Sequence, residues 1–176
     1  MYKLSRRSQD NLEGVDERLQ TVVRTAIALT KIDFGVIQGL RTEAQQKELV
    51  ARGASQTMKS KHLVGKAVDL MAYINGRASW EMNLYDDIAD AMKEAANISS
   101  VQICWGAAWA TPDMPYPMNI RKWKACEHTY YSKTNQAERT VAYPSTMEGA
   151  MNAYIDLRRS QERRPFMDGP HFELID

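Results

Sequence analysis

The clearest strand pattern in this chain, residues 66–74, carries an ionisable side chain at its centre. Alternation places Asp69 on one face of that strand together with Ala67 and Met71, while apolar residues fill the other face. An ionised carboxylate in an otherwise apolar strand is costly unless it is paired or bound to a cation. The pattern therefore predicts a sheet strand that borders a polar or metal-binding site.

One of the chain's 3 histidines, His62, stands one tight turn before this strand. An imidazole and a carboxylate are suitable zinc ligands, so His62 and Asp69 form a candidate metal-binding pair. The alternative is that Asp69 accepts hydrogen bonds from loop amides and that His62 only caps the loop. For an isolated pair of this kind, the second interpretation is favoured.

The segment Asp168-Gly169-Pro170-His171 adds a second carboxylate and a second imidazole. Pro170 fixes its own φ and stiffens the turn, and His171 opens a short strand in which it shares a face with Glu173. Three protein ligands and one free carboxylate are what a hydrolytic zinc site needs, because zinc lowers the pKa of a bound water towards ~7. The alternative is that Asp168 is only a turn residue, and spacing alone leaves both interpretations open.

Two helix starts carry a capping box, in which Ser or Thr is followed three residues later by Glu or Gln. One box pairs Thr42 with Gln45, and the helix that it opens is expected to end at Gly53. The other box pairs Ser145 with Glu148. Helical spacing of apolar residues predicts two further helices, at 12–31 and 80–97.

Short strands are expected at 33–39, 66–74, 101–105 and 171–174. Residues 111–145 are rich in Pro, Tyr, Lys and Asn and show no regular period. Helices mixed with short strands and hairpin signals predict an α+β fold, in which a small antiparallel sheet is flanked by helices.

Composition excludes several classes of protein. The formal net charge is +1, so nucleic acid is not an expected partner. No apolar stretch of about 18 residues exists, so no transmembrane segment is expected. The first residues lack the apolar region of a signal peptide, and Cys104 and Cys126 are too few for a disulfide framework. We therefore expect synthesis in a reducing cytoplasm.

Two motifs are similar to the signatures of a known peptidase family. Residues 60–69 resemble the SxHxxGxAxD signature of zinc D,D-carboxypeptidases and L-alanyl-D-glutamate endopeptidases, and Asp168-x-x-His171 resembles that family's second signature. Residues 39–46 and 170–174 are similar to the phage endolysin branch of the family. The resemblance implies a Hedgehog/DD-peptidase-like fold and a Zn²⁺ cofactor.

The resemblance also implies a role for individual residues. His62, Asp69 and His171 match the zinc ligands, and Asp168 matches the catalytic carboxylate that polarises water and passes a proton to the leaving amine. Ser60 matches a serine that fixes the loop around the ligands rather than acting as a nucleophile.

Arg41 matches an arginine that in relatives approaches the scissile carbonyl oxygen or a substrate carboxylate. Its positive charge would stabilise the developing oxyanion. The alternative for a lone arginine is a surface ion pair, and the motif match favours the catalytic interpretation.

The chain departs from the family in two places. Relatives often carry Trp-Gly-Gly-Asp-Trp where this chain has Trp-Gly-Ala-Ala-Trp at 105–109, so the acid of that motif is missing. Relatives also reach the final motif quickly, whereas here residues 111–164 intervene. We therefore expect a single zinc peptidase domain over 1–176 with an inserted subregion at about 111–164. The aromatic residues of the insertion are expected to form a small core of their own: Tyr116, Trp123, Tyr130, Tyr131 and Tyr143.

The function implied by the resemblance is hydrolysis of peptidoglycan stem peptides at the L-alanyl-D-glutamate bond, by a phage or prophage endolysin that lyses the host cell. Such an enzyme would be a monomer made in the host cytoplasm and would act on the cell wall. One alternative is a D-Ala-D-Ala carboxypeptidase on the same scaffold. The other is a catalytically inactive peptidoglycan-binding domain, which the presence of Asp168 argues against.

Overall fold

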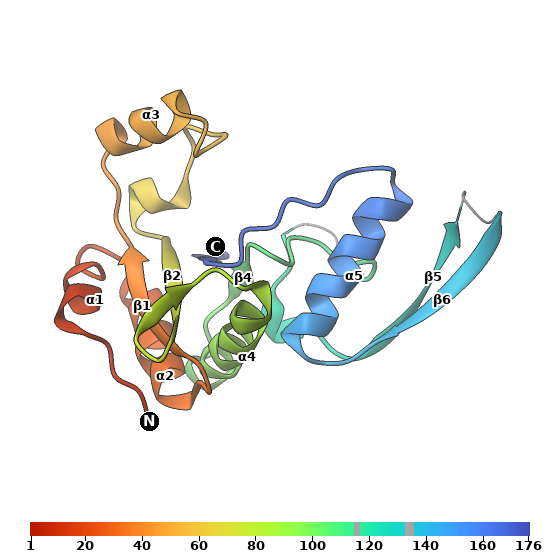
Figure 1. Cartoon of the computed structure of the whole chain (residues 1–176), viewed down its shortest axis with the longest axis horizontal. Coiled ribbons are helices and arrows are strands. Elements are labelled where there is room, and N and C mark those ends of the chain that lie inside the picture. The colour runs from red at the N-terminus through yellow and green to blue at the C-terminus, as the bar shows by residue number, and fades with distance from the viewer. Residues whose placement is uncertain (115–116, 133–135) are drawn as a thin grey trace.

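The fold is built around a five-stranded antiparallel sheet (Figure 1). The computed structural model describes residues 1–114, 117–132 and 136–176. Four strands follow the order β1-β2-β7-β4, and β3 pairs with the far end of β2. The strands are β1 (Asp33–Gln38), β2 (Ala67–Ile74), β3 (Arg77–Ser79), β4 (Ile103–Trp105) and β7 (His171–Leu174).

Helices precede and connect the strands of this sheet. They are α1 (Arg6–Asp10), α2 (Glu17–Leu29), α3 (Glu43–Ala51), α4 (Met82–Ser99) and α5 (Met147–Ser160), with short 3₁₀ turns η1 (Lys61–Val64) and η2 (Ile120–Lys122). No helix in the described ranges is long and apolar enough to span a bilayer.

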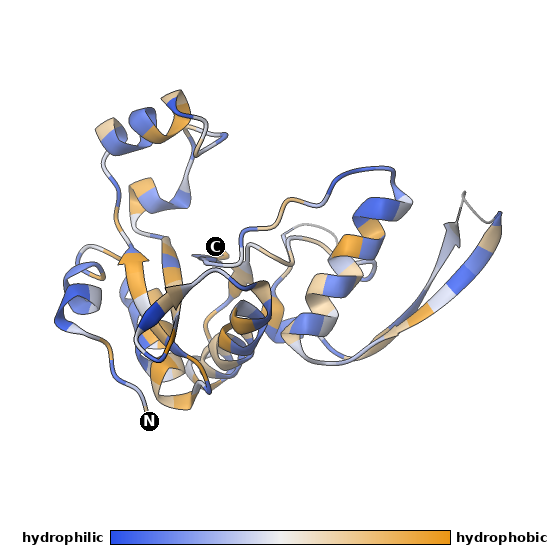
Figure 2. Ribbon diagram, in the orientation of Figure 1, coloured by the Kyte–Doolittle hydropathy of each residue, from blue (hydrophilic) through white to orange (hydrophobic). Residues whose placement is uncertain are grey.

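The hydrophobic core lies between one face of the sheet and helices α2 and α4. Alternate strand residues point into it, such as Val68 and Leu70 from β2 and Phe172 from β7. Hydrophobic residues accordingly line β1 and β2, while α1 is mostly hydrophilic (Figure 2). The residues between these core positions, Asp69 and His171 among them, therefore lie on the opposite face of the sheet.

Between β4 and β7 the chain forms η2, a two-stranded hairpin and α5. The hairpin strands are β5 (Cys126–Ser132) and β6 (Ala137–Tyr143), and they extend away from the main sheet beyond α5 (Figure 1). The Nζ atom of Lys93 on α4 donates hydrogen bonds to the carbonyl oxygens of Trp123, at 3.1 Å, and Ser145, at 2.7 Å. This lysine therefore fixes both ends of the hairpin segment to α4.

The expected mixture of helices and a small antiparallel sheet is confirmed, and several elements match closely. The capping box of Thr42 and Gln45 is present, and Gly53 follows the helix with a positive φ of 72°. The expected strand at 171–174 is present with the same bounds.

Three local expectations are wrong. The helix expected over 12–31 begins only at Glu17, because Gly14 adopts a positive φ of 75° and Asp16 caps the helix through the Arg18 amide. Helix α5 is capped by Thr146 rather than Ser145, since the Thr146 side chain accepts from the amide of Gly149. The aperiodic segment 111–145 contains a β-hairpin.

The aromatic residues of 111–164 do not form a separate core. Trp123 and Tyr143 are buried in the same hydrophobic cluster as the main sheet, Tyr130 packs against its edge, and Tyr131 is 58% exposed. Tyr116 lies outside the described residues.

Candidate metal centre

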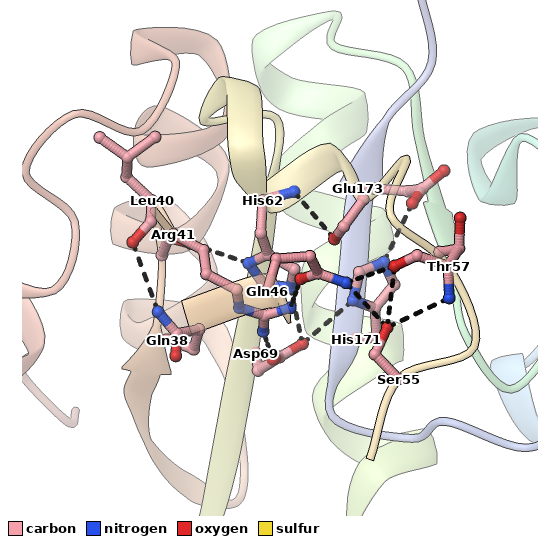
Figure 3. Close-up of polar contacts among 12 residues, drawn as sticks. Gln38, Leu40, Arg41, Gln46, Ser55, Thr57, His62, Asp69, His171 and Glu173 are labelled. Atoms are coloured by element: carbon pink, nitrogen blue, oxygen red, sulfur yellow. Dashed lines mark hydrogen bonds and ion pairs between the residues drawn. The ribbon is translucent and has the colours of Figure 1, made fainter. Parts of the chain in front are cut away.

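Pairing between β2 and β7 brings the candidate ligands together. Asp69 lies directly opposite His171 in the strand register. One carboxylate oxygen of Asp69, Oδ1, lies 3.0 Å from Nδ1 of His171 and 3.2 Å from Nε2 of His62 (Figure 3). The three side chains offer ligand atoms that all lie within 4.8 Å of one another.

A short 3₁₀ turn places His62 beside the sheet. The Ser60 hydroxyl accepts a hydrogen bond from the His62 amide at 3.4 Å and so begins this turn. Gly65 ends it with a positive φ of 66°, and a Cβ atom there would lie 2.3 Å from the carbonyl oxygen of Gly14. The Ser-x-His-x-x-Gly spacing therefore describes one capped turn that must end in glycine.

Hydrogen bonds at the outer ring nitrogens orient both imidazoles. Nδ1 of His62 lies 2.8 Å from the carbonyl oxygen of Gly39, and Nε2 of His171 lies 3.0 Å from Oε2 of Glu173. Because these oxygens only accept hydrogen bonds, Nδ1 of His62 and Nε2 of His171 carry the ring hydrogens. In the neutral rings, the lone pairs of Nε2 of His62 and Nδ1 of His171 therefore point at Asp69.

Two lone pairs and a carboxylate oxygen at these distances repel one another unless a cation lies among them. In protein metal sites, the ring nitrogen that does not bind the metal commonly donates a hydrogen bond to an acceptor, as both imidazoles do here. Two nitrogens and one carboxylate are also a donor set that zinc uses in proteins. The three residues are therefore suitable for binding a divalent metal ion.

Without a metal, a proton takes the place of the cation. Burial disfavours the charged form of His171, but hydrogen bonds to Asp69 and Glu173 outweigh that effect and raise its pKa to about 10. Burial likewise opposes charge on Asp69, yet hydrogen bonds from His171 and His62 keep the pKa of Asp69 well below its usual range. Both shifts come largely from the same contact, in which a protonated His171 donates to the ionised Asp69.

The structure places Asp168 beside this cluster, on the segment that leads into β7. Its amide donates to the carbonyl of Gly106 at 2.9 Å, and its own carbonyl accepts from the His171 amide at 3.1 Å. Burial raises the pKa of the Asp168 carboxyl, and the charges of His171, Asp69, His62 and Arg41 all act on it. Within the described part of the chain, no hydrogen bond reaches this carboxylate, so it can accept a proton.

Arg41 lies within the site rather than at the surface. Only 9% of its side chain is exposed, and its guanidinium lies 3.5 Å from Oδ2 of Asp69. The Arg41 amide donates to the carbonyl of His62 at 3.0 Å, which ties the two residues together. The ion pair that Arg41 forms with Asp69 therefore lies within this cluster, and its catalytic role stays a prediction.

Two residues of the site had no predicted role. Glu173 orients His171, and the shared strand face of these residues, two positions apart, was the signal that could have identified it. Gln46 is completely buried, accepts from Arg41 Nη1 at 2.7 Å, and donates to Ser55 and Thr57 of the following loop (Figure 3). Gln46 ends the 39–46 motif that resembles the phage branch, and this motif was the sequence signal for it, although no role was predicted.

The sheet and the His-Asp-His cluster define a protein with three side chains placed closely enough to hold one metal ion. Comparisons with known proteins identify its family. A family model described as phage L-alanyl-D-glutamate peptidase matches residues 1–129. The chain therefore belongs to the phage L-alanyl-D-glutamate peptidase family and is a peptidase.

Named relatives agree with this assignment. The L-alanyl-D-glutamate peptidase of Escherichia phage T5 is 34% identical over 112 residues, which cover 61% of this chain and 82% of that protein. The L-alanyl-D-glutamate peptidase of Listeria phage A118 is 34% identical over 79 residues, or 45% of this chain and 27% of that protein. The crystal structure of Serratia marcescens L-Ala D-Glu endopeptidase ChiX has a TM-score of 0.58 at 38% identity, covering 67% of this chain and 90% of ChiX.

Proposed function

We propose that this protein is a zinc-dependent peptidase that hydrolyses the L-alanyl-D-glutamate bond of peptidoglycan stem peptides, as a phage endolysin. The observation that carries the proposal is the His-Asp-His cluster with Asp168 beside it, in a chain that belongs to a family of this name. The names of the phage T5 and phage A118 relatives support this bond over the D-Ala-D-Ala bond.

Zinc would be held by Nε2 of His62, a carboxylate oxygen of Asp69 and Nδ1 of His171. When bound there, zinc would supply Lewis acidity and lower the pKa of water. The carbonyl of Gly39 and the carboxylate of Glu173 keep both imidazoles aimed at the ion. Ser60 contributes by beginning the turn that carries His62.

Asp168 would act as the general base and then as the general acid. Its carboxylate accepts a proton from the attacking water and delivers that proton to the amine of the leaving D-glutamate. Its half-buried position supports this role, because burial raises its pKa above that of an exposed aspartate and makes it a better proton acceptor.

Arg41 would bind the oxygen of the scissile carbonyl as negative charge develops on it. Its Nη1 is already bonded to Gln46, whereas its buried Nε has no acceptor among the described residues.

The finer architecture forms part of the same proposal. The catalytic unit has the Hedgehog/DD-peptidase-like fold, and residues 111–164 are an insertion before the last strand within one domain spanning 1–176. The enzyme works as a monomer on the host cell wall. The likeness to ChiX over 67% of this chain supports the fold assignment.

Digestion of purified peptidoglycan sacculi tests the proposed bond. Mass analysis of the soluble fragments should find new amino-terminal D-glutamate after incubation with the zinc-loaded protein. Release of D-alanine instead would identify a carboxypeptidase, and binding without cleavage would identify an inactive binding domain. The His62→Ala variant, as the control, should lose both metal and cleavage.

A further inference from the structure

A groove lies between α5 and β6, in the part of the chain that follows the family match. That match ends at residue 129, before β6 and α5 begin. The groove has a volume of about 400 Å³, which is in the range of small-ligand sites. We call it the α5–β6 groove, and its principal lining residues are Arg139, Tyr143, Asn152, Ile155, Asp156 and Arg159.

Two arginines face the α5–β6 groove from different elements. Arg139 stands on β6 and Arg159 stands on α5, and both are exposed. In the described ranges, neither guanidinium is within 4.0 Å of a carboxylate. Arginine is the side chain best suited to bind phosphate oxygens, because its planar group donates two parallel hydrogen bonds.

The α5–β6 groove is also lined by a carboxylate, Asp156. The hydroxyl of Tyr143 donates a hydrogen bond to Oδ2 of Asp156 at 2.7 Å, which holds that carboxylate in place. Its other oxygen, Oδ1, accepts no hydrogen bond within the described residues. A carboxylate oxygen would repel a phosphate but would accept from a ligand hydroxyl.

We propose that the α5–β6 groove binds a phosphorylated polyol or sugar, with its phosphate on Arg139 and Arg159 and a hydroxyl on Asp156. Asn152 adds a polar amide to the wall, and Ile155 packs against the carbon skeleton. The repeat unit of an anionic wall polymer and the headgroup of a glycerophospholipid both have this chemistry. The groove shares no lining residue with the candidate metal centre, and α5 and β6 lie away from β2 (Figure 1), so this inference does not depend on the proposed peptidase reaction.

Titration of the full-length ¹⁵N-labelled protein with sn-glycerol 3-phosphate tests the proposal. The Nε–H signals of Arg139 and Arg159 should shift and saturate, and inorganic phosphate should bind more weakly because it offers no hydroxyl for Asp156. Arg139→Gln and Arg159→Gln should each weaken binding about tenfold, as expected for the loss of a charged hydrogen bond. Asp156→Asn should reduce the preference for glycerol phosphate over inorganic phosphate.

Arg77→Gln is the matched control, since it removes the same charge from the exposed strand β3. An equal loss of affinity in Arg77→Gln, or shifts that do not saturate, would overturn the proposal. His62→Ala should bind glycerol phosphate normally, and Arg139→Gln should cleave a soluble stem peptide normally, so failure here is separable from failure of the proposed function. Sedimentation with phosphatidylglycerol vesicles, compared with retention of a soluble poly(glycerol phosphate), identifies the source of the ligand.

Discussion

Gly106 lies directly against the backbone of Asp168. A Cβ atom at Gly106 would lie 2.4 Å from the carbonyl oxygen of Asp168 and 3.0 Å from Cβ of His171. The Trp-Gly pair at 105–106 is therefore a close contact that positions the proposed base and one proposed metal ligand together. The indole of Trp105 strengthens the same contact by donating to the carbonyl of Gly169 at 2.7 Å.

Gly106→Ala should therefore displace Asp168 and His171 and reduce cleavage by about 100-fold, since misplacement of about 1 Å has that effect on catalysis. Zinc affinity, measured by competition with a chelator, should fall as well. Gly76→Ala is the control: its φ of 76° makes alanine unfavourable, but nothing lies within 4 Å of its Cβ position. Gly76→Ala should lower stability and leave zinc affinity unchanged. Wild-type cleavage by Gly106→Ala would contradict the positioning role.

Asp168→Asn should retain the metal and lose cleavage by about 10³-fold, the usual contribution of a general base. Metal content by mass spectrometry and release of D-glutamate termini measure the two effects separately. The pH profile of the unmodified enzyme adds a second check. Because burial raises the pKa of Asp168, activity should rise with pH above the range of an exposed aspartate. Full activity of Asp168→Asn would remove this residue from the mechanism.

Glu173→Ala should weaken zinc binding by about 10- to 100-fold, because His171 loses the acceptor that orients its ring. Glu173→Gln keeps a carbonyl oxygen at that position and should recover much of the affinity. Isothermal titration with zinc compares the two variants. Equal affinity in Glu173→Ala and the unmodified protein would show that the ring is oriented by Asp69 alone.

Zinc binding should release a proton from His171. Its pKa of about 10 in the metal-free protein means that it is charged at pH 7 to 9, and zinc binds only the neutral ring. Apparent affinity should therefore increase about tenfold per pH unit across this range. Calorimetry in buffers of different ionisation enthalpy counts the protons. Affinity that is independent of pH would mean that His171 is already neutral.

Asp86 on α4 offers a prediction for stability. Burial and the neighbouring charges of Asp87, Glu148 and Asp90 raise its pKa to about 6, although a hydrogen bond from the Asp87 backbone opposes them. The folded state therefore binds more protons than the unfolded state between pH 3.8 and pH 6, and stability is lost as pH rises through this window.

Asp86→Asn should remove that cost and raise the free energy of unfolding at pH 7. The shift alone corresponds to about 3 kcal/mol, and solvent screening of this half-exposed group reduces the expected gain to about 1 kcal/mol. The gain should disappear below pH 4. Denaturant unfolding at pH 7 and pH 4 provides the comparison, and an equal gain at both values would point to another cause.

Local signals in the sequence predicted the parts of the fold that local chemistry decides. The Thr42 capping box and the strand that begins at His171 are examples, since each depends on hydrogen bonding or alternation within a few residues. The hairpin at 126–143 was missed because most of its side chains are exposed, which removes the apolar alternation that marks a half-buried strand. Helix α5 was placed one residue early because Ser145 and Thr146 are both good N-caps.

The residues of the candidate site could be predicted from the sequence, but their arrangement in space could not. The motifs named His62, Asp69 and His171, yet only the strand register shows that Asp69 and His171 face each other. Pairing between segments 102 residues apart has no local signal. Gln46 was a position of the 39–46 motif, but its role was not predicted, because that role depends on hydrogen bonds to Arg41 and to the loop residues Ser55 and Thr57.

The position of β7 between β2 and β4 has a consequence for biosynthesis. Ribosomes build proteins from the amino terminus, and domains generally fold as units during synthesis. Strand β7, an interior strand of this sheet, is made after the other strands of the sheet and brings His171 with it. A nascent chain that has not yet exposed residues 171–174 therefore lacks both a complete sheet and the His171 member of the candidate metal centre.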